Sequence, residues 1–408
     1  MPVVFRRTAC NRYSLPVLIG ALEKHLAGAN VYLLDDHLHL KDFARHFPLT
    51  ILCYSFMTTQ LGTVLREVSF IREHYGSRVL LLGGGPHPTA DPEGTLKAGF
   101  DAVFTGEAER IFPEAVERVI KEGPGAVQGQ SFNDTDIPRL SIDDYFPISE
   151  TLGLYGPMEI SRGCLHHCAF CQTRRIFAPP LRHRSVESVV AGISKAMKGG
   201  QKRTFFISPN ALSYGSEGKG TVNLAALGGL LSAIKATGTK YIDLAYFPSE
   251  VRPEYVSEEA LALIKKYCTN RKIAVGIQTG SDSLLRRLRR GHTVAQAVET
   301  VALIRSMGLM AHCDFIFGFP GETGDDVKAS LELMELITKK FGARIHFHYF
   351  LPLPGTPLWG GKPEPLDDRT RSALARFEED GRLDGWWKEQ EKLSMEIQEW
   401  KARGYITV

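Results

Sequence analysis

Short apolar runs alternate with amphipathic stretches along most of the chain, which is the pattern of parallel strands covered by helices. In the first 125 residues strands are expected at 3–6, 31–34, 49–56, 78–82 and 102–105, and helices at 14–26, 60–74 and 110–121. This order predicts a doubly wound α/β sheet of the Rossmann or flavodoxin type. In such sheets ligands bind beyond the carboxyl ends of the strands.

The same alternation returns after residue 156. Strands are expected at 158–162, 204–208, 241–246, 272–277, 311–317 and 344–350, each followed by a helical stretch except the last. Six such units predict a partial (β/α)6 barrel, in which chemistry gathers at the carboxyl ends of the strands.

Four parts are therefore expected: a sheet domain at 1–125, a linker at 126–155, a barrel domain at 156–358 and a small helical C-terminal extension at 359–408. The linker interpretation rests on a composition rich in Gly, Asp, Pro and Ser, with the run 133–138 at its centre. The extension has charged amphipathic stretches around its tryptophans, and we expect its helices to close the open side of the barrel.

Glycine-rich loops follow two strands of the first domain. One reads GGGPHPT over 83–89, and the other reads TGEAE over 105–109. Successive glycines let the backbone come close to a ligand and expose its amides. Neither GxGxxG nor GxxxxGK[ST] is present, so a nucleotide-phosphate loop is a poor explanation.

Cys164, Cys168 and Cys171 stand at a Cx3Cx2C spacing directly after the first barrel strand. A structural zinc site takes four protein ligands, and no fourth cysteine is near, although His166 or His167 could complete the set. A cubane iron–sulfur cluster held by only three sulfurs keeps one iron open for chemistry. The other four cysteines stand singly in apolar runs and read as core residues: Cys10, Cys53, Cys268 and Cys313.

Composition excludes several classes of protein. No apolar run reaches the roughly 18–20 residues of a spanning helix, and the first residues lack the order of a signal peptide, so no membrane partner and a cytoplasmic location are expected. Seven cysteines, three of them clustered, do not suit a disulfide framework. A net charge of +3 is too small to argue for nucleic acid, and the basic run 286–290 is interpreted as favourable charge at a helix end.

The cysteine spacing, with Phe170 before the last cysteine, resembles the radical S-adenosylmethionine superfamily over about 156–358. The resemblance implies a 4Fe-4S cluster held by Cys164, Cys168 and Cys171, an open iron that binds S-adenosylmethionine, and an electron donor that reduces the cluster. The runs GGGPHPTADPEGTL and AGFDAVFTGEAE resemble the cobalamin-binding domain that precedes the radical domain in one large branch. Cobalamin, used as methylcobalamin, is then the third cofactor.

One departure from the wider cobalamin family concerns cobalt. Many such domains carry Asp-x-His-x-x-Gly after the first strand, whereas this chain reads TACNRYS over 8–14 and offers no histidine there. The cobalt would lack that imidazole ligand. His87 either contacts the cofactor or shapes its proline-flanked turn.

The strand ends supply the remaining expected contacts. Those toward cobalamin are Ser55, Met57, Thr58, Gly84, Gly85, His87, Gly106 and Glu107. Those toward the cluster and S-adenosylmethionine are Phe170, Ser208, Asn210, Ser249, Arg252, Gln278, His348 and Tyr349. Gln278 falls where the family often places a ribose-binding residue, and Arg252 either neutralises a carboxylate or forms a surface pair. His346 and His348 share one side of their strand, but a hydrogen-bonded core histidine explains one of them equally well.

The resemblance implies a cobalamin-dependent, class B radical methyltransferase acting on an unactivated carbon. No cysteine follows Cys313, which disfavours branches with auxiliary clusters such as the methylthiotransferases. The compact layout resembles archaeal members, one of which methylates the α-carbon of a glutamine in methyl-coenzyme M reductase, so a protein or peptide substrate is the first hypothesis. A small-molecule methylase, a cobalamin-dependent cyclase or ring-contraction enzyme, and a non-enzymatic cobalamin sensor stay open.

Overall fold

The computed structural model describes residues 1–134 and 140–408, which divide into two compact units. The N-terminal unit comprises 1–157, 175–178 and 399–408, and the barrel unit comprises 158–174 and 179–398. Residues 135–139, within the expected linker, lie outside the described residues. Among the residues described, no helix is both long enough and apolar enough to cross a membrane.

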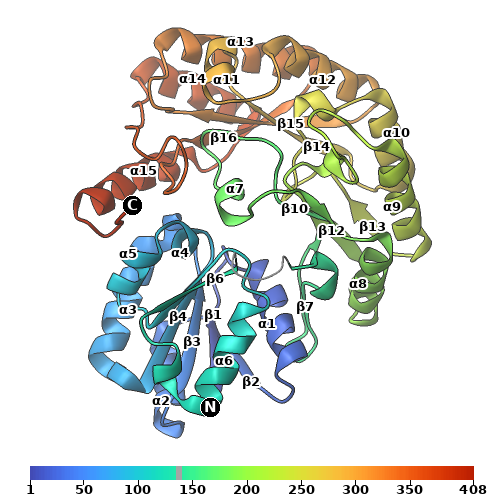
Figure 1. Ribbon diagram of the computed structural model, residues 1–408. Coiled ribbons are helices and arrows are strands. Elements are labelled where there is room, and N and C mark those ends of the chain that lie inside the picture. Colours follow the sequence, from blue (N-terminus) through green and yellow to red (C-terminus); the bar gives the residue numbers. More distant parts are fainter. Residues whose placement is uncertain (135–139) are drawn as a thin grey trace. The chain divides into compact units, whose positions relative to one another are not determined.

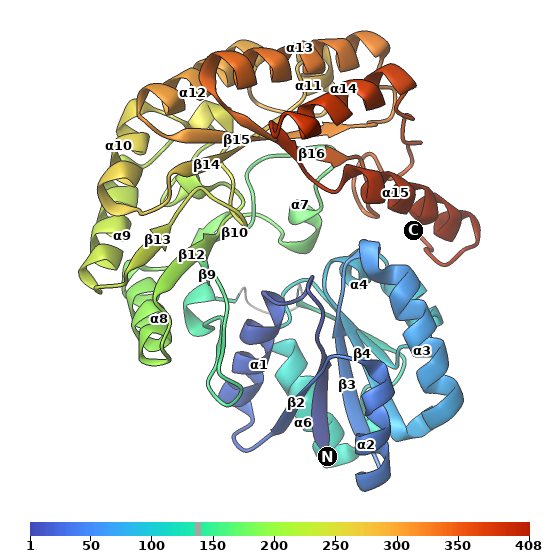
Figure 2. The same cartoon turned by 180° about the vertical axis from the view of Figure 1, so that it is seen from behind.

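A six-stranded parallel sheet forms the centre of the N-terminal unit, with the order β2-β1-β3-β4-β5-β6 (Figure 1). Its strands are β1 (Pro2–Arg6), β2 (Asn30–Leu34), β3 (Thr50–Ser55), β4 (Val79–Gly84), β5 (Ala102–Thr105) and β6 (Gln130–Asn133). Its helices are α1 (Ser14–His25), α2 (Leu40–His46), α3 (Leu61–Tyr75), α4 (Pro86–Ala90), α5 (Pro92–Lys97) and α6 (Ile111–Glu122). Helices α1 and α6 cover one face of this sheet and α3 covers the other (Figures 1 and 2).

The core of the N-terminal unit follows from the two periodicities in its sequence. Leu15, Ile19 and Leu22 are spaced to share one face of α1, and all three are buried against the sheet. Every residue of β3 is buried, as expected for a central parallel strand with helices on both faces. The five strands and three helices expected in this region are therefore confirmed.

The segment expected as a linker contributes to the first sheet instead of only connecting. Strand β6 pairs in parallel with β5, and the Phe132 ring stacks on Phe104 with centroids 5.1 Å apart. A two-stranded antiparallel pair follows, made of β7 (Ile148–Ser149) and β8 (Leu154–Tyr155). Strand β6 has only four residues, and its one apolar residue, Phe132, stands between two polar ones. This pattern is too short for an edge strand to be recognised from the sequence.

The barrel unit contains two parallel sheets, ordered β13-β12-β9 and β14-β15-β16-β17. Its longer strands are β12 (Arg203–Ile207), β13 (Tyr241–Asp243), β14 (Lys272–Gln278), β15 (Met310–Phe317) and β16 (Arg344–Tyr349). The two-residue strands are β9 (Met158–Glu159), β10 (Ser161–Arg162), β11 (Arg182–His183) and β17 (Leu383–Asp384). Helices α8 to α13 lie along the outside of these sheets (Figures 1 and 2).

Most helices of this part of the chain lie between successive strands, whereas the last helix follows the last strand. They are α7 (Thr173–Ile176), α8 (Val186–Lys198), α9 (Leu224–Ala236), α10 (Glu258–Tyr267), α11 (Asp282–Arg287), α12 (Val294–Ser306), α13 (Gly324–Phe341), α14 (Asp368–Glu379) and α15 (Trp387–Ala402). The six expected strands are confirmed, and the first is divided into β9 and β10.

The C-terminal extension contains the expected helices, α14 and α15, together with one short strand that was not expected. Strand β17 pairs in parallel with β16, and two residues are too short to show a period in sequence. Residues 399–408 belong to the N-terminal unit, where the Thr407 N–H donates to Asp91 Oδ2 at 2.9 Å. Only part of the extension therefore packs on the barrel strands.

Alternation along the last strands decides what the barrel unit presents to its interior. In β15 the buried residues Cys313 and Phe315 alternate with the partly exposed His312 and Asp314. Strand β16 repeats the pattern, and its register places His346 beside Asp314.

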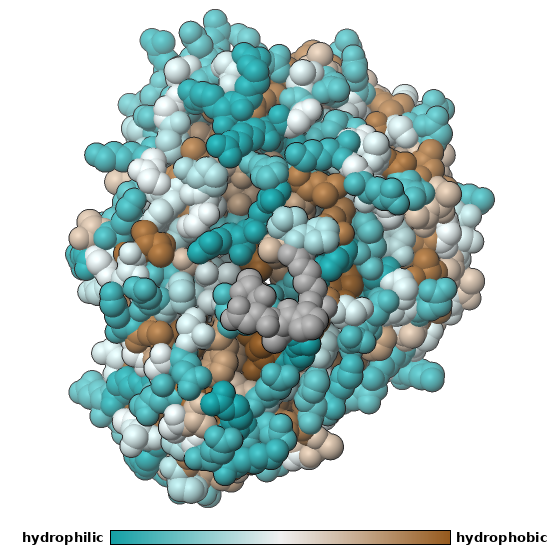
Figure 3. Space-filling view, viewed as in Figure 1, coloured by the Kyte–Doolittle hydropathy of each residue, from teal (hydrophilic) through white to brown (hydrophobic). Residues whose placement is uncertain are grey.

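The face drawn in Figure 3 is mainly hydrophilic, with apolar residues in small separate groups.

Candidate functional site

The cysteine loop follows β10, and backbone donors hold two of its sulfurs. The His166 N–H donates to Cys164 Sγ at 3.4 Å, and the Thr173 N–H donates to Cys171 Sγ at 3.5 Å. Such donors stabilise sulfur in its ligating, thiolate form.

The sulfur positions suit a cluster better than a single zinc ion. Among the described residues, the sets whose ligand atoms all lie within 4.8 Å of one another contain no cysteine. Three sulfurs on one tetrahedral zinc at 2.3 Å would lie about 3.8 Å apart, whereas in a cubane each binds a different iron. The imidazole of His166 is hydrogen bonded to the Tyr255 hydroxyl at 3.0 Å, and His167 Nε2 lies 2.5 Å from Arg174 Nη1. Neither histidine is therefore poised to be the fourth zinc ligand.

Two guanidinium groups lie beside the middle sulfur. Arg252 Nη1 donates to Cys168 Sγ at 3.2 Å, and Arg290 Nη1 donates to the same atom at 3.5 Å. Burial acts to raise the pKa of Cys168, but the charges of Arg290 and Arg252 outweigh it and hold this pKa below its ordinary value. Nearby cations thus favour the thiolate that a metal requires.

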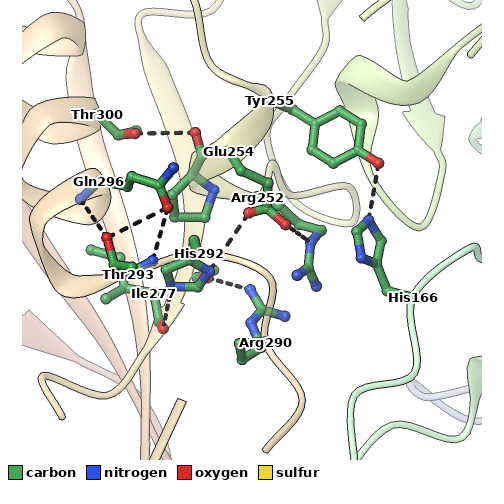
Figure 4. A network of polar contacts seen from close by, with 12 residues as sticks. His166, Arg252, Glu254, Tyr255, Ile277, Arg290, His292, Thr293, Gln296 and Thr300 are labelled. Carbon is green, nitrogen blue, oxygen red and sulfur yellow. Dashed lines mark hydrogen bonds and ion pairs between the residues drawn. The ribbon is translucent and has the colours of Figure 1, made fainter. Parts of the chain in front are cut away.

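A buried polar network holds Arg252 in place (Figure 4). Its Nε donates to Glu254 Oε1 at 2.7 Å, and Glu254 Oε2 lies 3.6 Å from His292 Nδ1. His292 Nε2 lies 3.2 Å from the carbonyl oxygen of Ile277 on β14. The loop after β13, the end of β14 and the connection between α11 and α12 are thereby tied together around one guanidinium.

Two nitrogen atoms of these arginines lack a hydrogen-bond partner among the described residues. They are Arg252 Nη2 and Arg290 Nε, and both are buried. An unpaired buried donor costs about 1–3 kcal/mol, and more when it is charged. The arrangement is therefore suited to an anionic ligand beside Cys168.

Other residues expected at the strand ends are partly occupied by the loops themselves. The Ser208 hydroxyl donates to the Asn210 carbonyl at 2.8 Å, and the Ser249 hydroxyl donates to the Ser208 carbonyl at 3.3 Å. Asn210 accepts the Arg252 N–H at 3.4 Å, while its Nδ2 is buried without a partner in the described part of the chain. Asn210 thus offers a spare donor, whereas the two serines shape the loops.

Gln278 stands out in its backbone as well as its side chain. It has φ +79° beside a register shift in β14, a conformation that costs a residue with a side chain about 1–3 kcal/mol. Only 3% of it is exposed, and its Oε1 has no hydrogen-bond partner among the described residues. Strain and an unpaired acceptor together favour the expected contact of Gln278 with a ligand, which stays a prediction.

A cavity of about 730 Å³ lies inside the barrel unit, and its lining includes Phe170 of the cysteine loop, Gln278 and His348. His348 Nδ1 lies 3.2 Å from Gln390 Nε2, and burial lowers the pKa of His348 to about 4. Tyr349 also borders this cavity, but its hydroxyl donates to the Glu364 carbonyl at 2.8 Å. The shared side expected for His346 and His348 is confirmed, since both line the cavity.

In the N-terminal unit the strand ends are built from small residues. Gly85 has φ +100°, and a Cβ there would lie 2.9 Å from the Phe56 nitrogen and 3.1 Å from Ser55 Oγ. Ser55 Oγ is already hydrogen bonded to Ser14 Oγ at 3.0 Å. At Gly85 the backbone can take this course only without a side chain.

His87 is fully buried next to that turn. Its Nδ1 is hydrogen bonded to Thr58 Oγ1 at 3.1 Å, and its ring centroid lies 5.4 Å from that of Phe56. Burial lowers its pKa to about 4. These contacts account for His87 as a residue that shapes the turn, and its contact with a cofactor stays a prediction.

Further residues of the same edge differ in their exposure. Met57 is 36% exposed, whereas Thr58 is fully buried. Gly106 has φ +72°, and the Glu107 N–H donates to Asp134 Oδ2 at 3.0 Å. A cavity of about 340 Å³ includes Gly106 and Glu107 in its lining.

The sequence interpretation missed Glu254, His292 and Arg290. The basic run was assigned to a helix end, which holds for Arg286 and Arg287 in the last turn of α11 but is wrong for Arg290, which contacts Cys168. Its position directly before a glycine gave no separate signal. Glu254, two residues after Arg252, could have been found as its partner.

Comparison with known proteins identifies both units. The family model of the B12 binding domain matches residues 10–116, and that of the Radical SAM superfamily matches residues 158–334. An uncharacterised protein of Methanopyrus kandleri is 26% identical over 366 residues, which cover 74% of this chain and 67% of that protein. The ribosomal protein uS12 methylthiotransferase RimO of Trichlorobacter lovleyi is 30% identical over 58% of this chain and 49% of its own length. The chain thus spans about half to two thirds of these relatives.

A solved structure supports the fold. The radical S-adenosylmethionine methyltransferase TsrM of Kitasatospora setae, with cobalamin and a 4Fe-4S cluster bound, gives a TM-score of 0.65 at 17% identity and covers 88% of this chain and 74% of its own. Another structure of TsrM holds tryptophan substrate and an analogue of S-adenosylmethionine. The order of a B12 binding domain followed by a radical domain therefore matches the two units described here.

Proposed function

We propose that this chain is a cobalamin-dependent methyltransferase acting on carbon, because residues 158–334 match the Radical SAM superfamily model and residues 10–116 match that of the B12 binding domain. The observation that carries the proposal is the pair of buried, incompletely paired guanidinium groups beside Cys168. They lie where a ligand bound at a cluster would present negative charge. When bound, the cluster with S-adenosylmethionine supplies a carbon-centred radical and cobalamin supplies the methyl group.

In this proposal the cysteine loop holds the cluster and the arginines hold the cosubstrate. Cys164, Cys168 and Cys171 would each ligate one iron. The unpaired nitrogens of Arg252 and Arg290 would donate to the carboxylate of S-adenosylmethionine, in an arrangement that planar guanidinium groups favour. Because both arginines also donate to Cys168 Sγ, they would hold the carboxylate near the cluster.

Neutral polar groups complete the expected binding of S-adenosylmethionine. In the described part of the chain, Asn210 Nδ2 and Gln278 Oε1 have no hydrogen-bond partner, so Asn210 can donate to a hydroxyl oxygen and Gln278 can accept from an amino or hydroxyl group. Phe170 packs near Phe319 with ring centroids 5.6 Å apart and borders the cavity, where it would exclude water. Ser208, Ser249, His348 and Tyr349 are proposed to shape this pocket.

In the N-terminal unit, backbone would contact cobalamin more than side chains do. Gly84, Gly85 and Gly106 let a large flat cofactor approach the strand ends, while Ser55 and Glu107 offer polar groups and Met57 an exposed apolar one. Thr58 and His87 support the loop from below. The electron donor for the cluster is a further proposed partner.

For the substrate we retain a protein glutamine, methylated at its α-carbon in methyl-coenzyme M reductase, as the first candidate. It is supported by the resemblance to archaeal enzymes of this layout. A small molecule is the second candidate, favoured by the tryptophan in the TsrM structure and by a cavity of about 730 Å³, which can enclose one.

A methylthiotransferase activity, as in RimO, receives less support. Cys53, Cys268 and Cys313 are buried, and Cys10 is exposed. These four cysteines also stand singly and far apart in the sequence. They therefore form no second motif of the usual three-cysteine kind.

The test uses anaerobically reconstituted full-length protein with cobalamin, a reductant and S-adenosylmethionine labelled with deuterium in its methyl group. We expect both 5′-deoxyadenosine and S-adenosylhomocysteine, and mass spectrometry should find three deuterium atoms on the product. Cys168→Ala should abolish deoxyadenosine formation, whereas Cys10→Ser should not. Deoxyadenosine without S-adenosylhomocysteine would overturn methyl transfer in favour of a cyclase, and neither product would favour a sensor.

The two substrate candidates are separated in the same assay. Glutamine-containing peptides of methyl-coenzyme M reductase are offered in parallel with free amino acids such as tryptophan and glutamine. Label in the peptide alone supports the protein substrate, and label in a free amino acid alone overturns it.

A further inference from the structure

A second group of metal-ligand side chains lines the barrel cavity, and it includes no cysteine. Asp384 faces two imidazoles: His346 Nδ1 lies 2.5 Å from Oδ1, and His312 Nε2 lies 3.3 Å from Oδ2. The ligand atoms of these three residues all lie within 4.8 Å of one another. We propose that His312, His346 and Asp384 bind one divalent transition-metal ion of the zinc type.

The strand register fixes the three side chains on one side of the sheet. His346 is opposite Asp384 of β17 and opposite Asp314 of β15, and His312 lies two residues before Asp314. Because side chains two residues apart point to the same side of a strand, all three face the cavity. Three neighbouring strands thus position the set, which is a more rigid support than a loop provides.

The contacts leave an incompletely satisfied arrangement without an ion. His312 Nε2 is buried and has no hydrogen-bond partner among the described residues, although it lies 3.3 Å from the carboxylate. The two imidazole rings approach edge to face, with centroids 5.5 Å apart. A cation between them would give the lone pair of His312, that of His346 and the carboxylate a common partner.

The donor set decides the kind of ion. Calcium and magnesium prefer all-oxygen sites, whereas two imidazoles with one carboxylate suit zinc, iron and similar ions. Three protein ligands leave at least one position open, as in sites that bind an exchangeable water or substrate group. A donor atom of the substrate could occupy that open position, and this part of the inference rests on the proposed function. Binding of the metal ion itself does not depend on the proposed function.

A neighbouring set shares one histidine with the first. His346, Asp314 and His348 also bring their ligand atoms within 4.8 Å of one another. There, however, His348 Nε2 is 3.9 Å from Asp314 Oδ1, and His348 Nδ1 is 3.2 Å from Gln390. The first set is preferred because its contacts with the carboxylate are shorter and each histidine has a ring nitrogen near the carboxylate.

The test is equilibrium dialysis of the full-length, cluster-loaded protein against a series of buffered free Zn²⁺ concentrations. Zinc and iron are measured together by mass spectrometry of the elements, so that zinc in the cysteine loop would be seen as lost iron. We expect one zinc per chain with iron unchanged. His346→Ala and Asp384→Asn should each weaken zinc binding by more than about 100-fold, because even residues behind metal ligands change affinity by roughly 10- to 100-fold.

Matched variants separate ligand loss from general damage. His74→Ala, an exposed histidine on α3, should leave zinc binding unchanged. His348→Ala should weaken zinc binding less than the ligand variants do, by no more than roughly 10- to 100-fold, as expected of a residue behind the ligands. Asp384→Asn keeps the shape of the side chain, so it tests the site even where His346→Ala fails to fold. The proposal is overturned if zinc binds only where it displaces iron. It is also overturned if His348→Ala loses zinc binding while His312→Ala keeps it.

Discussion

The strand ends of the two units differ in the kind of atoms that they offer a ligand. In the N-terminal unit Gly85 must lack a side chain, and the Ser55 hydroxyl is already bonded to Ser14. In the barrel unit Arg252, Gln278 and Asn210 each keep a buried polar atom without a partner among the described residues. The first region is shaped mainly by its backbone and has one such atom near the turn, His87 Nε2, whereas the second offers several unpaired hydrogen-bonding groups.

This difference predicts that substitutions in the two units will impair the protein in different ways. A substitution in the N-terminal unit should act through steric fit and stability, because few side-chain bonds there await a ligand. A substitution at the barrel strand ends should act mainly on affinity, because the polar atoms are spare in the protein alone. The predictions below test that division, beginning with the largest expected effect.

The largest effect concerns pH and the buried His87. Burial lowers its pKa to about 4, so between pH 6.5 and 4 the unfolded chain binds a proton that the folded chain does not. Stability is therefore present above pH 6.5 and is lost as pH falls toward 4, by about 3 kcal/mol in total. Denaturant titrations from pH 7 to 4.5 should show a smaller decline for His87→Gln than for the wild type. Equal slopes would contradict the assignment of His87 as a neutral, structural residue.

The next effect tests the barrel side of the comparison. Arg290→Gln removes a charged donor from the space beside Cys168 and should weaken binding of S-adenosylmethionine by roughly 10- to 100-fold, the equivalent of about 1.5–3 kcal/mol. Arg286→Gln, in the same basic run but exposed, is the control and should change affinity less than about 2-fold. Calorimetry on the cluster-loaded protein measures both. Similar losses of affinity in the two variants would mean that the general positive charge of this segment attracts S-adenosylmethionine, and that the position of Arg290 beside Cys168 does not matter.

A smaller effect is expected from steric change in the N-terminal unit. Gly85→Ala places a Cβ 2.9 Å from the Phe56 nitrogen in a left-handed conformation and should lower the free energy of unfolding by about 2 kcal/mol. Gly125→Ala, where a Cβ meets nothing within 4 Å, should change stability little. Denaturant unfolding and the amount of cobalamin retained are measured together. A stable Gly85→Ala variant that binds cobalamin normally would show that this turn is not shaped for a ligand.

Much of the fold could be predicted because its signals are local. Strand β15 and strand β16 carry clear alternation, and that period alone placed His346 and His348 on one side. The edge strands β6 and β17 could not be predicted, since a strand of two or four residues gains its stability from pairing and not from its own pattern.

The candidate site divides in the same way. The cysteine loop has a spacing that can be read directly, and the polar residues at strand ends follow from the topology of parallel sheets. Arg290 and His312 could not be assigned, because their roles depend on contacts with residues 122 and 72 positions away. Asp384 was hidden for a further reason, since the strand that carries it was not expected.

The smallest effect concerns strain at Gln278, where stability and affinity should move in opposite directions. Gln278→Gly relieves a left-handed backbone at φ +79° and removes an unpaired buried oxygen, so it should raise the free energy of unfolding by about 1 kcal/mol. The same change removes an amide proposed to bind S-adenosylmethionine and should weaken its binding. Arg289→Gly is the control, because Arg289 has φ +57° and is exposed. It should gain similar stability with no loss of affinity, whereas a Gln278→Gly variant that gains stability and keeps full affinity would show that the strain at this position does not serve ligand binding.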